Sequence, residues 1–504
     1  MHYCMFINGE WVDTDDHYEI VNPATGDVEA TLAKGDLSHV DRAVDAAQHA
    51  FNASGWRHTG MSERAELLER VAQAIAERAA ELSVSAAREN GTPVRLAQAL
   101  SVGFPVAHIN HYAALARHYV GERVVTSTQD TAEIIRREPL GVVAGIVPWN
   151  FPLLLAVWKT MPAIAAGNSV VLKVDEKTPI GTLLLAGMLQ ESGLPAGVFN
   201  VVTGDGPSVG GYLSAHPKVR KVSFTGSTAT GKSVMRSAAE NVKQLTLELG
   251  GKGANIVLDD ADLELAVDGA LWAFLAHAGQ ACESGTRLLI HESIHDEFLE
   301  RLVRRAGDLR VGDPLDPSSD IGPVMNARQR ERILDYVTGA EAEGARVVFR
   351  GTLPESLSKG GYWVPPTIFS DVTPDMRIAY EEIFGPVLAV LRFKDDDEAV
   401  SIANGTEYGL SAGVWSIDRG RAMTVATRLE VGTVWINDWH NLSGNLPFGG
   451  YKQSGFGREL GPHALDEFTQ EKGICLDMSS RDSRVAWGLV LPVAEQVPVK
   501  TQGE

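Results

Sequence analysis

Cysteine is scarce in this chain, which has three cysteines among its 504 residues. So sparse and odd-numbered a set excludes a disulfide framework and suits a reducing compartment. No Cys-x-x-Cys pair or close His/Cys cluster suggests structural zinc, so we expect no metal site. The first residues also lack the basic stretch and the long apolar run of a secretory signal, and we therefore expect a cytoplasmic protein.

Positive charge is also in deficit, because 45 lysines and arginines stand against 65 aspartates and glutamates, a formal net charge of -20. A surface this acidic repels phosphate backbones, so we expect no nucleic-acid partner. One uncharged stretch, residues 140–158, is nearly long enough to span a bilayer, but its glycines and prolines would break a helix. Instead of a membrane span we expect a buried strand, a turn at residues 148–150 and a helix from about Leu153.

The alternation of apolar and helical segments indicates the fold class. The chain length predicts two or three domains, and no internal repeat is visible. An amphipathic helix is expected from a cap at Ser62 to residues 90–93. Strands are expected at 142–147, 169–173, 222–224, 255–258, 286–290 and 433–437, and helices at 180–192 and 294–306. This order predicts an α/β protein with two Rossmann-like domains, each an open parallel sheet with crossover helices.

Cys282 is the first candidate for chemistry. Its surroundings, GQACESGTR at residues 279–287, are small and glycine-rich, so the backbone can turn tightly and expose the sulfur. A reactive thiol must be reachable and must ionise. The ordinary alternative is a small buried hydrophobe, which is how we interpret Cys4 and Cys475.

Glu248 and Asn150 are candidates for a base and for an oxyanion donor. Leucines surround Glu248 and paired glycines follow it, and burial would raise the pKa of its carboxyl towards the range of a general base. The alternative is a surface carboxylate or a partner of Lys252. Asn150 lies in a proline-flanked turn, where its amide can donate to a developing oxyanion or simply stabilise the turn.

A glycine-rich segment at residues 226–233 offers a competing function. A strand leads into it and a helix follows, an arrangement whose backbone N–H groups bind phosphate. The segment fits the P-loop pattern G-x-x-x-x-G-K-[ST], and Asp259 ends an apolar strand as a magnesium-binding aspartate would. These features alone predict a magnesium-dependent P-loop nucleotide triphosphatase.

Taken together and in order, the motifs resemble the aldehyde dehydrogenase superfamily, in its branch that does not acylate coenzyme A. The resemblance extends over about residues 6–476 and rests on PWNFP at 148–152, FTGS at 224–227, LELGGK at 247–252, GQ at 279–280 with Cys282, EEIFGPV at 381–387 and PFGGYKQSG at 447–455. The triphosphatase interpretation leaves Cys282, Glu248 and Asn150 unexplained. The same three residues argue against a protein of this fold without turnover.

The resemblance implies a role for each catalytic candidate. Cys282 would attack the aldehyde carbonyl, and the Asn150 amide and the Cys282 N–H would hold the oxyanion. Hydride would pass to a nicotinamide and leave a thioester. Glu248 would activate the water that hydrolyses this thioester. Lys159 and Glu459 match positions that support proton movement, or they form a structural ion pair.

The resemblance also implies a dinucleotide site. Lys173 and Glu176 would bind the adenosine ribose, where the carboxylate repels a 2′-phosphate and favours NAD over NADP. Val174 departs from the proline common at its position, and Gly253 departs from serine or alanine. Trp149 would lie on the adenosine side. The residues expected at the cofactor are Ile146, Val147, Pro148, Trp149, Lys173, Glu176, Gly206, Phe224, Thr225, Gly226, Ser227, Leu249, Gly250, Glu382 and Phe384.

A substrate tunnel is implied by the same resemblance. Its expected lining is Leu155, Trp158, Leu275, Ala281, Glu283, Trp439, Leu442 and Phe448. Most of these side chains are apolar, so we predict a hydrophobic or aromatic aldehyde. A cage of Trp158 and Trp439 around a quaternary ammonium aldehyde is the alternative.

The expected domains follow. Residues 1–120 and 138–250 would form the NAD-binding domain, and residues 251–465 the catalytic domain. Residues 121–137 and 466–480 would form a small β oligomerisation element, and residues 481–504 a tail. An edge strand of this kind is covered by a partner subunit, which predicts a homodimer or a homotetramer.

Overall fold

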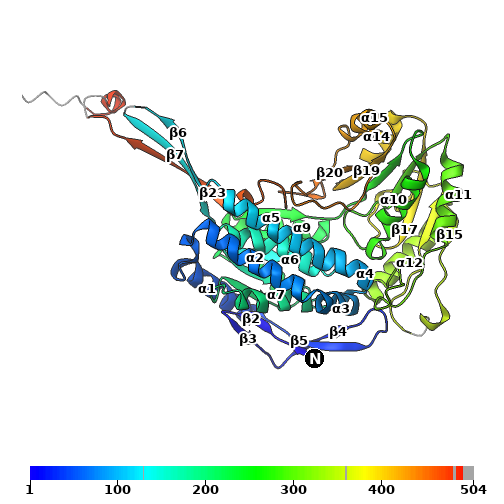
Figure 1. Ribbon diagram of the computed structural model, residues 1–504, viewed down its shortest axis with the longest axis horizontal. Coiled ribbons are helices and arrows are strands. Elements are labelled where there is room, and N and C mark those ends of the chain that lie inside the picture. Colours follow the sequence, from blue (N-terminus) through cyan, green and yellow to red (C-terminus); the bar gives the residue numbers. More distant parts are fainter. Residues whose placement is uncertain (129, 358–359, 481–483, 492–504) are drawn as a thin grey trace, which may run out of the picture. The chain divides into compact units, whose positions relative to one another are not determined.

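The computed structural model describes residues 1–128, 130–357, 360–480 and 484–491. The chain divides into two compact units. The first comprises Met1–His118 and Pro139–Phe468, and the second comprises Tyr119–Glu138 and the chain from Thr469 onwards. Figure 1 shows both units with their elements labelled.

The first large sheet of unit 1 has eight strands in the order β22-β12-β11-β8-β9-β10-β2-β3. Its five central strands are parallel, and both edges are antiparallel. The central strands are apolar runs because helices cover both faces of such a sheet. The strands are β2 (Met5–Ile7), β3 (Glu10–Val12), β8 (Val142–Ile146), β9 (Ser169–Lys173), β10 (Phe199–Val202), β11 (Val219–Thr225), β12 (Gln244–Glu248) and β22 (Gly455–Phe456).

Helices and a small sheet surround this first sheet. Helix α1 packs on β8, β9 and β10. Helix α6 packs on β8 and β9, and α5 and α2 pack against α6 (Figure 1). The helices are α1 (Leu37–Ala53), α2 (Met61–Glu77), α3 (Ala79–Asn90), α4 (Val94–Ala97), α5 (Phe104–His118), α6 (Pro152–Ala165), α7 (Ile180–Glu191), α8 (Gly211–Ala215) and α9 (Thr228–Ala238). The small sheet has the order β1 (His2–Tyr3), β5 (Val28–Ala33) and β4 (His17–Val21).

The second large sheet of unit 1 has seven strands in the order β15-β16-β17-β14-β13-β19-β20, all parallel except β15. Its strands are β13 (Ala254–Val257), β14 (Arg287–His291), β15 (Arg346–Arg350), β16 (Thr367–Ser370), β17 (Val387–Phe393), β19 (Ser411–Trp415) and β20 (Thr433–Ile436). The accompanying elements are α10 (Leu263–Leu275), α11 (His295–Ala306), α12 (Ala327–Ala342), α13 (Arg377–Tyr380), α14 (Asp396–Asn404), α15 (Arg419–Ala426) and the pair β18 (Tyr408–Gly409) and β21 (Tyr451–Lys452). The predicted α/β architecture with two open, mainly parallel sheets is confirmed.

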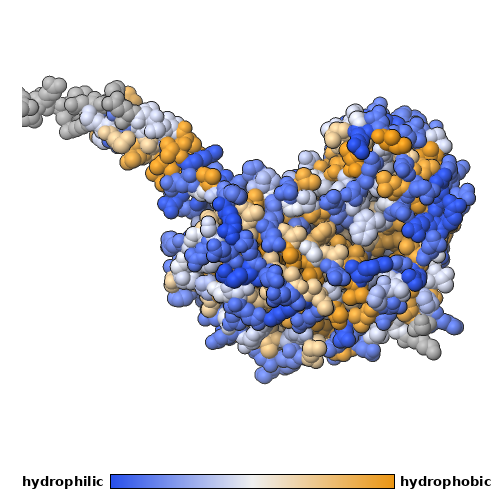
Figure 2. All heavy atoms as spheres, viewed as in Figure 1, coloured by the Kyte–Doolittle hydropathy of each residue, from blue (hydrophilic) through white to orange (hydrophobic). Residues whose placement is uncertain are grey.

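Unit 2 is a three-stranded sheet in the order β23 (Thr469–Asp477), β7 (Thr131–Pro139) and β6 (Glu122–Ser127). Strands β6 and β7 are antiparallel, and ion pairs such as Lys472–Glu138 (2.6 Å) join β23 to β7. Apolar side chains on this sheet are exposed, among them Val124 and Leu476, and Figure 2 shows apolar residues at its surface. Of the predicted tail, residues 484–491 contain one short 3₁₀ turn, and residues 481–483 and 492–504 lie outside the described residues.

Several predicted elements differ from the observed ones. The helix expected from Ser62 to Asn90 is two helices separated at Arg78, and Gly60 precedes the first of them without a side-chain cap. The uncharged stretch forms β8, a turn and the start of α6, and no helix in the described residues is long and apolar enough to cross a membrane. The proposed boundary after residue 250 does not follow the sheets strictly, because β22 returns to pair with β12.

Candidate active site

Cys282 follows a strained turn that leads from α10 towards β14. His277 (φ 51°, ψ 41°) and Ala278 (φ 54°, ψ 34°) both have left-handed backbone, and Gly279 continues it. Such a conformation in a residue with a side chain costs on the order of 1 kcal/mol or more and persists only where the surroundings fix it. An added Cβ at Gly279 would lie 2.3 Å from the Gly385 carbonyl oxygen, so only glycine fits there.

A buried hydrogen-bond network holds this turn. The His277 ring contacts the Thr92 hydroxyl (2.9 Å), which in turn donates to the Asn90 side chain (2.7 Å). Burial lowers the pKa of His277 to about 3, so the ring is neutral at physiological pH. Gln280 donates to the His277 carbonyl (3.1 Å) and accepts from the backbone N–H of Met325 (2.9 Å). The network therefore fixes the backbone two residues before the cysteine.

Two cavities meet at Cys282, whose side chain is partly exposed. One is a polar cleft lined by Pro148, Trp149, Asn150, Thr225, Gly226, Ser227, Leu249, Gly250, Cys282, Gln329, Arg332, Glu382 and Phe384. The other is a narrow apolar cavity of about 30 Å³, lined by Leu100, Phe104, Asn150, Phe151, Leu154, Leu155, Trp158, Ala276, Cys282, Glu283, His440, Leu442 and Phe448. Cys282 and Asn150 belong to both linings, so one thiol and one amide face two different binding spaces.

Asn150 is oriented by the loop that carries the cysteine. Its amide nitrogen donates to the Gln280 carbonyl (2.9 Å), and Asn90 donates to the Asn150 carbonyl (3.1 Å). An amide nitrogen carries two hydrogens, so the second N–H stays available beside Cys282. The amide can therefore donate to negative charge that develops on a substrate oxygen bound at the sulfur.

Glu248 ends β12 and is 2% exposed. Neither of its carboxylate oxygens has a hydrogen-bond partner among the described residues. A Cβ at Gly449, the neighbour of the pocket residue Phe448, would lie 2.8 Å from a Glu248 oxygen, so the carboxylate faces this segment. Burial, and then the charge of Glu459, raise the pKa of Glu248 well above its ordinary value. A carboxyl whose pKa is raised in this way is a better proton acceptor when deprotonated than an ordinary surface carboxylate.

Lys159 and Glu459 form an ion pair. Their side chains are almost fully buried, with 2.6 Å between Nζ and Oε1, and the Ser223 hydroxyl lies 3.3 Å from the same oxygen. Both charges act on the pKa of Glu248, Glu459 raising it and Lys159 lowering it. The sequence left two roles open for Lys159 and Glu459, proton movement or a structural ion pair. The structure shows them as an ion pair whose charges act on the candidate base Glu248.

Glu283 contacts the Cys282 thiol and His440 contacts Glu283, an arrangement that sequence reasoning missed. The Cys282 thiol donates to Glu283 Oε2 (3.3 Å), and His440 Nδ1 lies 3.0 Å from the other carboxylate oxygen. Burial would raise the pKa of Glu283, but the bond and charge of His440 lower it below its ordinary value. Burial, followed by the Glu283 charge, raises the pKa of the Cys282 thiol. Glu283 thus favours the thiol over the thiolate.

We therefore expect Glu283→Gln to make Cys282 more reactive. Removing a neighbouring negative charge stabilises the thiolate, so the pKa of the thiol falls and more thiolate is present at neutral pH. The measurement is the rate of alkylation by iodoacetamide against pH, with modification of Cys282 followed by mass spectrometry. The profile should move to lower pH in Glu283→Gln and stay in place in the exposed control Glu292→Gln. An unchanged profile, or one at higher pH, contradicts this account.

The polar cleft gathers part of the predicted cofactor set. Ser227 caps α9 by accepting from the Thr230 N–H (3.2 Å), and Glu382 accepts from the Gly251 N–H (2.9 Å). The Trp149 ring lies edge-on to Phe384 at 5.4 Å between centroids. Trp149 thus lies in the cleft beside Phe384, and its place on the adenosine side stays a prediction. Gln329 and Arg332 also line the cleft, and no motif had indicated them.

The remaining predicted cofactor residues lie outside this lining. Ile146, Val147 and Phe224 are buried in and beside the sheet, and exposed Gly206 begins the short π-helix Gly206–Gly210. Lys173 and Glu176 form an ion pair (3.5 Å), and Lys177 adds a second one (2.5 Å).

The apolar cavity contains five of the eight residues predicted for the substrate: Leu155, Trp158, Glu283, Leu442 and Phe448. Leu275 instead lines a separate cavity with Trp272, and Ala281 is buried outside the lining. Trp439 is 1% exposed, packs on Trp435 (5.2 Å) and donates to the Glu283 carbonyl (3.1 Å). A cage of Trp158 and Trp439 is therefore not formed.

The glycine-rich segment does not form a P-loop. In that motif the helix follows the loop and its lysine, whereas here α9 already begins at Thr228 and Lys232 lies inside it. Asp259, the expected magnesium ligand, follows a strand of the other large sheet and pairs with Arg421 (2.6 Å). The triphosphatase interpretation has no structural support.

The fold and the site define a class of enzyme in which a cysteine lies between a polar cleft and an apolar pocket. The model of the aldehyde dehydrogenase family matches residues 11–474, and the chain belongs to this family. A betaine aldehyde dehydrogenase of Bacillus subtilis is 42% identical over 94% of this chain and 97% of its own length. An aldehyde dehydrogenase of Agaricus bisporus is 41% identical over 94% of this chain and 95% of its own. Among solved structures, an aldehyde dehydrogenase from Bacillus cereus in complex with NAD+ is 40% identical to this chain. The match covers 95% of this chain and 97% of the solved chain, with a TM-score of 0.92.

Proposed function

We propose that this protein oxidises a hydrophobic or aromatic aldehyde to its carboxylic acid with NAD, through a thioester on Cys282. Membership of the aldehyde dehydrogenase family supports the reaction class. The observation that carries the mechanism is the position of Cys282 in the linings of both cavities. An aldehyde in the apolar pocket and a nicotinamide in the polar cleft would meet at its sulfur.

The polar cleft fits NAD by the chemistry of its donors. Backbone N–H groups at the start of α9, with Ser227, suit a pyrophosphate, and the Glu382 carboxylate suits ribose hydroxyls. When bound, NAD supplies the hydride acceptor. Burial would raise the pKa of Glu176, but Lys173 and Lys177 lower it below its ordinary value, so its carboxylate is charged at neutral pH. We propose that this charge disfavours the 2′-phosphate of NADP.

The protein groups divide the chemistry between them. Cys282 first loses its thiol proton to solvent. Its thiolate then bonds to the aldehyde carbon, and the carbonyl oxygen takes the negative charge beside the Asn150 amide. Loss of hydride from that carbon leaves a thioester on Cys282. Glu248 takes a proton from water, the resulting hydroxide attacks the thioester, and the Cys282 thiolate leaves as the acid forms.

The pocket supports a slender, apolar substrate. Leu100, Phe104, Leu154 and Phe448 are among the apolar side chains of its narrow lining, and transfer of apolar surface from water provides binding free energy. A flat or unbranched aldehyde suits this narrow, apolar lining better than a bulky branched one. Glu283 and His440 also belong to this lining and contact each other, with 3.0 Å between His440 Nδ1 and Glu283 Oε1.

An aldehyde panel assayed with NAD and with NADP tests this proposal. Hexanal and benzaldehyde should have a kcat/KM at least about tenfold above that of small charged aldehydes and of pivaldehyde, since each lost methylene contact costs about 1 kcal/mol. NAD should be preferred over NADP. The Bacillus subtilis relative is named for betaine aldehyde, so that compound belongs in the panel. A higher kcat/KM for it, or for small charged aldehydes, contradicts the substrate class, and a lack of NADH formation with every aldehyde contradicts the function.

We also propose a homodimer or homotetramer assembled through the sheet β23-β7-β6. Its support is the exposure of apolar side chains such as Val124, Val125 and Leu476, which a partner subunit would cover. A cytoplasmic location agrees with the three unpaired cysteines.

A further inference from the structure

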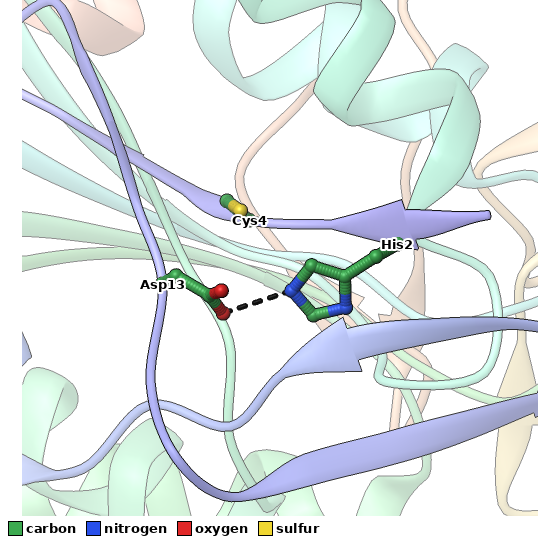
Figure 3. A group of neighbouring side chains, drawn as sticks. All are labelled: His2, Cys4 and Asp13. Carbon is green, nitrogen blue, oxygen red and sulfur yellow. Dashed lines mark hydrogen bonds and ion pairs between the residues drawn. The ribbon is translucent and has the colours of Figure 1, made fainter.

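His2, Cys4 and Asp13 converge beside the small sheet of unit 1, away from every residue named in the two cavities. One potential ligand atom from each lies within 4.8 Å of the others. Figure 3 shows the His2 ring pointing at the Asp13 carboxylate, with Cys4 on the neighbouring stretch of the same chain segment. His2 and Cys4 are two residues apart in extended chain and so share a face, and Asp13 follows β3.

A second histidine approaches the same carboxylate. His17, the first residue of β4, has its Nε2 3.3 Å from Asp13 Oδ1, and His2 Nε2 lies 2.8 Å from that oxygen. The two imidazole rings are in edge-to-face contact at 4.6 Å. Hydrogen bonding, chiefly from His2, lowers the pKa of Asp13, so the carboxylate is ionised at neutral pH. Two imidazoles thus contact one carboxylate, and the Cys4 thiol lies in a group with one of these imidazoles and the carboxylate.

The backbone and a neighbouring side chain already orient His2. Strand β1 pairs with β5 so that His2 lies opposite Thr31, and the Thr31 hydroxyl is 2.8 Å from His2 Nδ1. Ligand histidines in metal sites usually make such a bond with the ring nitrogen that does not hold the metal, which leaves the other nitrogen directed at the ion. Here that other nitrogen, Nε2, is the one directed at Asp13, 2.8 Å from its carboxylate oxygen.

We propose that His2 Nε2, Cys4 Sγ, Asp13 and His17 form a zinc-binding site. A thiolate with imidazole and carboxylate is a donor set that Zn²⁺ accepts in tetrahedral geometry, with bonds of about 2.0–2.3 Å. Donors bound to one such ion lie roughly 3.3–3.7 Å apart. The ligand atoms of His2, Cys4 and Asp13 lie within 4.8 Å of one another, so the side chains must rotate on binding to reach that spacing. Binding replaces the thiol proton of Cys4, which is released to solvent, while the imidazoles bind as neutral rings.

The ligands of the proposed site come from separate segments of the chain. A search for closely spaced metal-binding motifs in the sequence therefore does not find them. The sequence predicted no metal because it lacks a Cys-x-x-Cys pair, whereas these ligands come from β1, the chain after β3 and β4. An ion here would cross-link the ends of three strands near the start of the chain. The proposal is independent of the oxidation chemistry, because none of its residues lines either cavity.

The test is Zn²⁺ binding to the full-length Cys282→Ala protein, in which the active-site thiol cannot compete for the ion. After removal of metal with a chelator, Zn²⁺ is titrated in competition with a chromophoric chelator. We expect one equivalent to bind, with affinity reduced at least tenfold by Cys4→Ala or His2→Ala. Cys475→Ala is the control, since it removes an exposed thiol outside the cluster, and the Zn²⁺ affinity should be unchanged.

Cobalt provides the second readout. Co²⁺ should give a thiolate-to-metal charge-transfer absorption that Cys4→Ser loses and Cys475→Ser retains. Thr31→Val should weaken binding while it leaves the four ligands in place. Circular dichroism checks that each variant is folded. Equal Zn²⁺ affinity in Cys4→Ala and in its parent, or a cobalt complex without the charge-transfer band, overturns the proposal and leaves a hydrogen-bonded surface cluster.

Discussion

Cys282→Ala should abolish aldehyde oxidation, with kcat falling on the order of 10⁴-fold or more, while NAD binding persists. Without the sulfur no covalent adduct forms, and the neighbouring amide and carboxylate have no nucleophile to assist. NAD binding should change little, because Cys282 is one of thirteen residues in the lining of the polar cleft. The measurements are NADH absorbance with hexanal and calorimetric titration with NAD.

The control for this variant is Cys475→Ala, which removes an exposed thiol from β23 and should keep normal activity. Substantial turnover by Cys282→Ala would rule out the thioester route. Loss of NAD binding together with activity would instead show that the substitution disturbs the strained turn at His277 and Ala278, and the mechanism would then require another test.

Glu248→Gln should separate the two halves of the reaction. Thiolate attack and hydride loss remain, but water is no longer deprotonated, so the thioester accumulates. General-base removal of this kind slows a step by roughly 10²–10⁴-fold. Stopped-flow absorbance should therefore show a burst of NADH close to one equivalent per active site, followed by a slow steady state.

The role of Glu248 as a base also predicts how turnover changes with pH. Glu248 acts as a base only when deprotonated, and its pKa is raised by burial and then by Glu459. Wild-type turnover should hence rise with pH through this elevated pKa, above the ordinary carboxyl range, and the glutamine variant should lack that limb. The exposed control Glu240→Gln should keep the wild-type profile. Full steady-state activity in Glu248→Gln would exclude it as the essential base.

Buried parallel strands were the part of the fold most open to prediction. Residues 169–173 form β9 as expected, because a strand covered on both faces is an uninterrupted apolar run. The break between α2 and α3 was missed, since Arg78 is neither glycine nor proline and the apolar periodicity continues through it. The two residues of β22 are too few to produce a strand pattern, so its return to the first sheet could not be seen.

In the site, chain-local motifs indicated single residues but not their neighbours. Cys282, Asn150 and Glu248 were indicated by unusual local context. The pairing of Glu283 with His440 joins positions 157 residues apart, which no local pattern reveals. Whether Trp439 faced a cavity or the core was decided by packing against Trp435, and that contact depends on the folded sheet.

Gly279 has a wider significance than its size suggests. The segment opposite it, at Gly385, directly follows Glu382 and Phe384 of the polar cleft, while Gly279 itself leads to Cys282. Because Gly279 has no side chain, the backbone that leads to Cys282 can lie close to the backbone at Gly385, next to the cleft residue Phe384. A methyl group at residue 279 would meet the Gly385 carbonyl oxygen at 2.3 Å, so it would force apart the backbone that leads to Cys282 and the backbone next to Phe384.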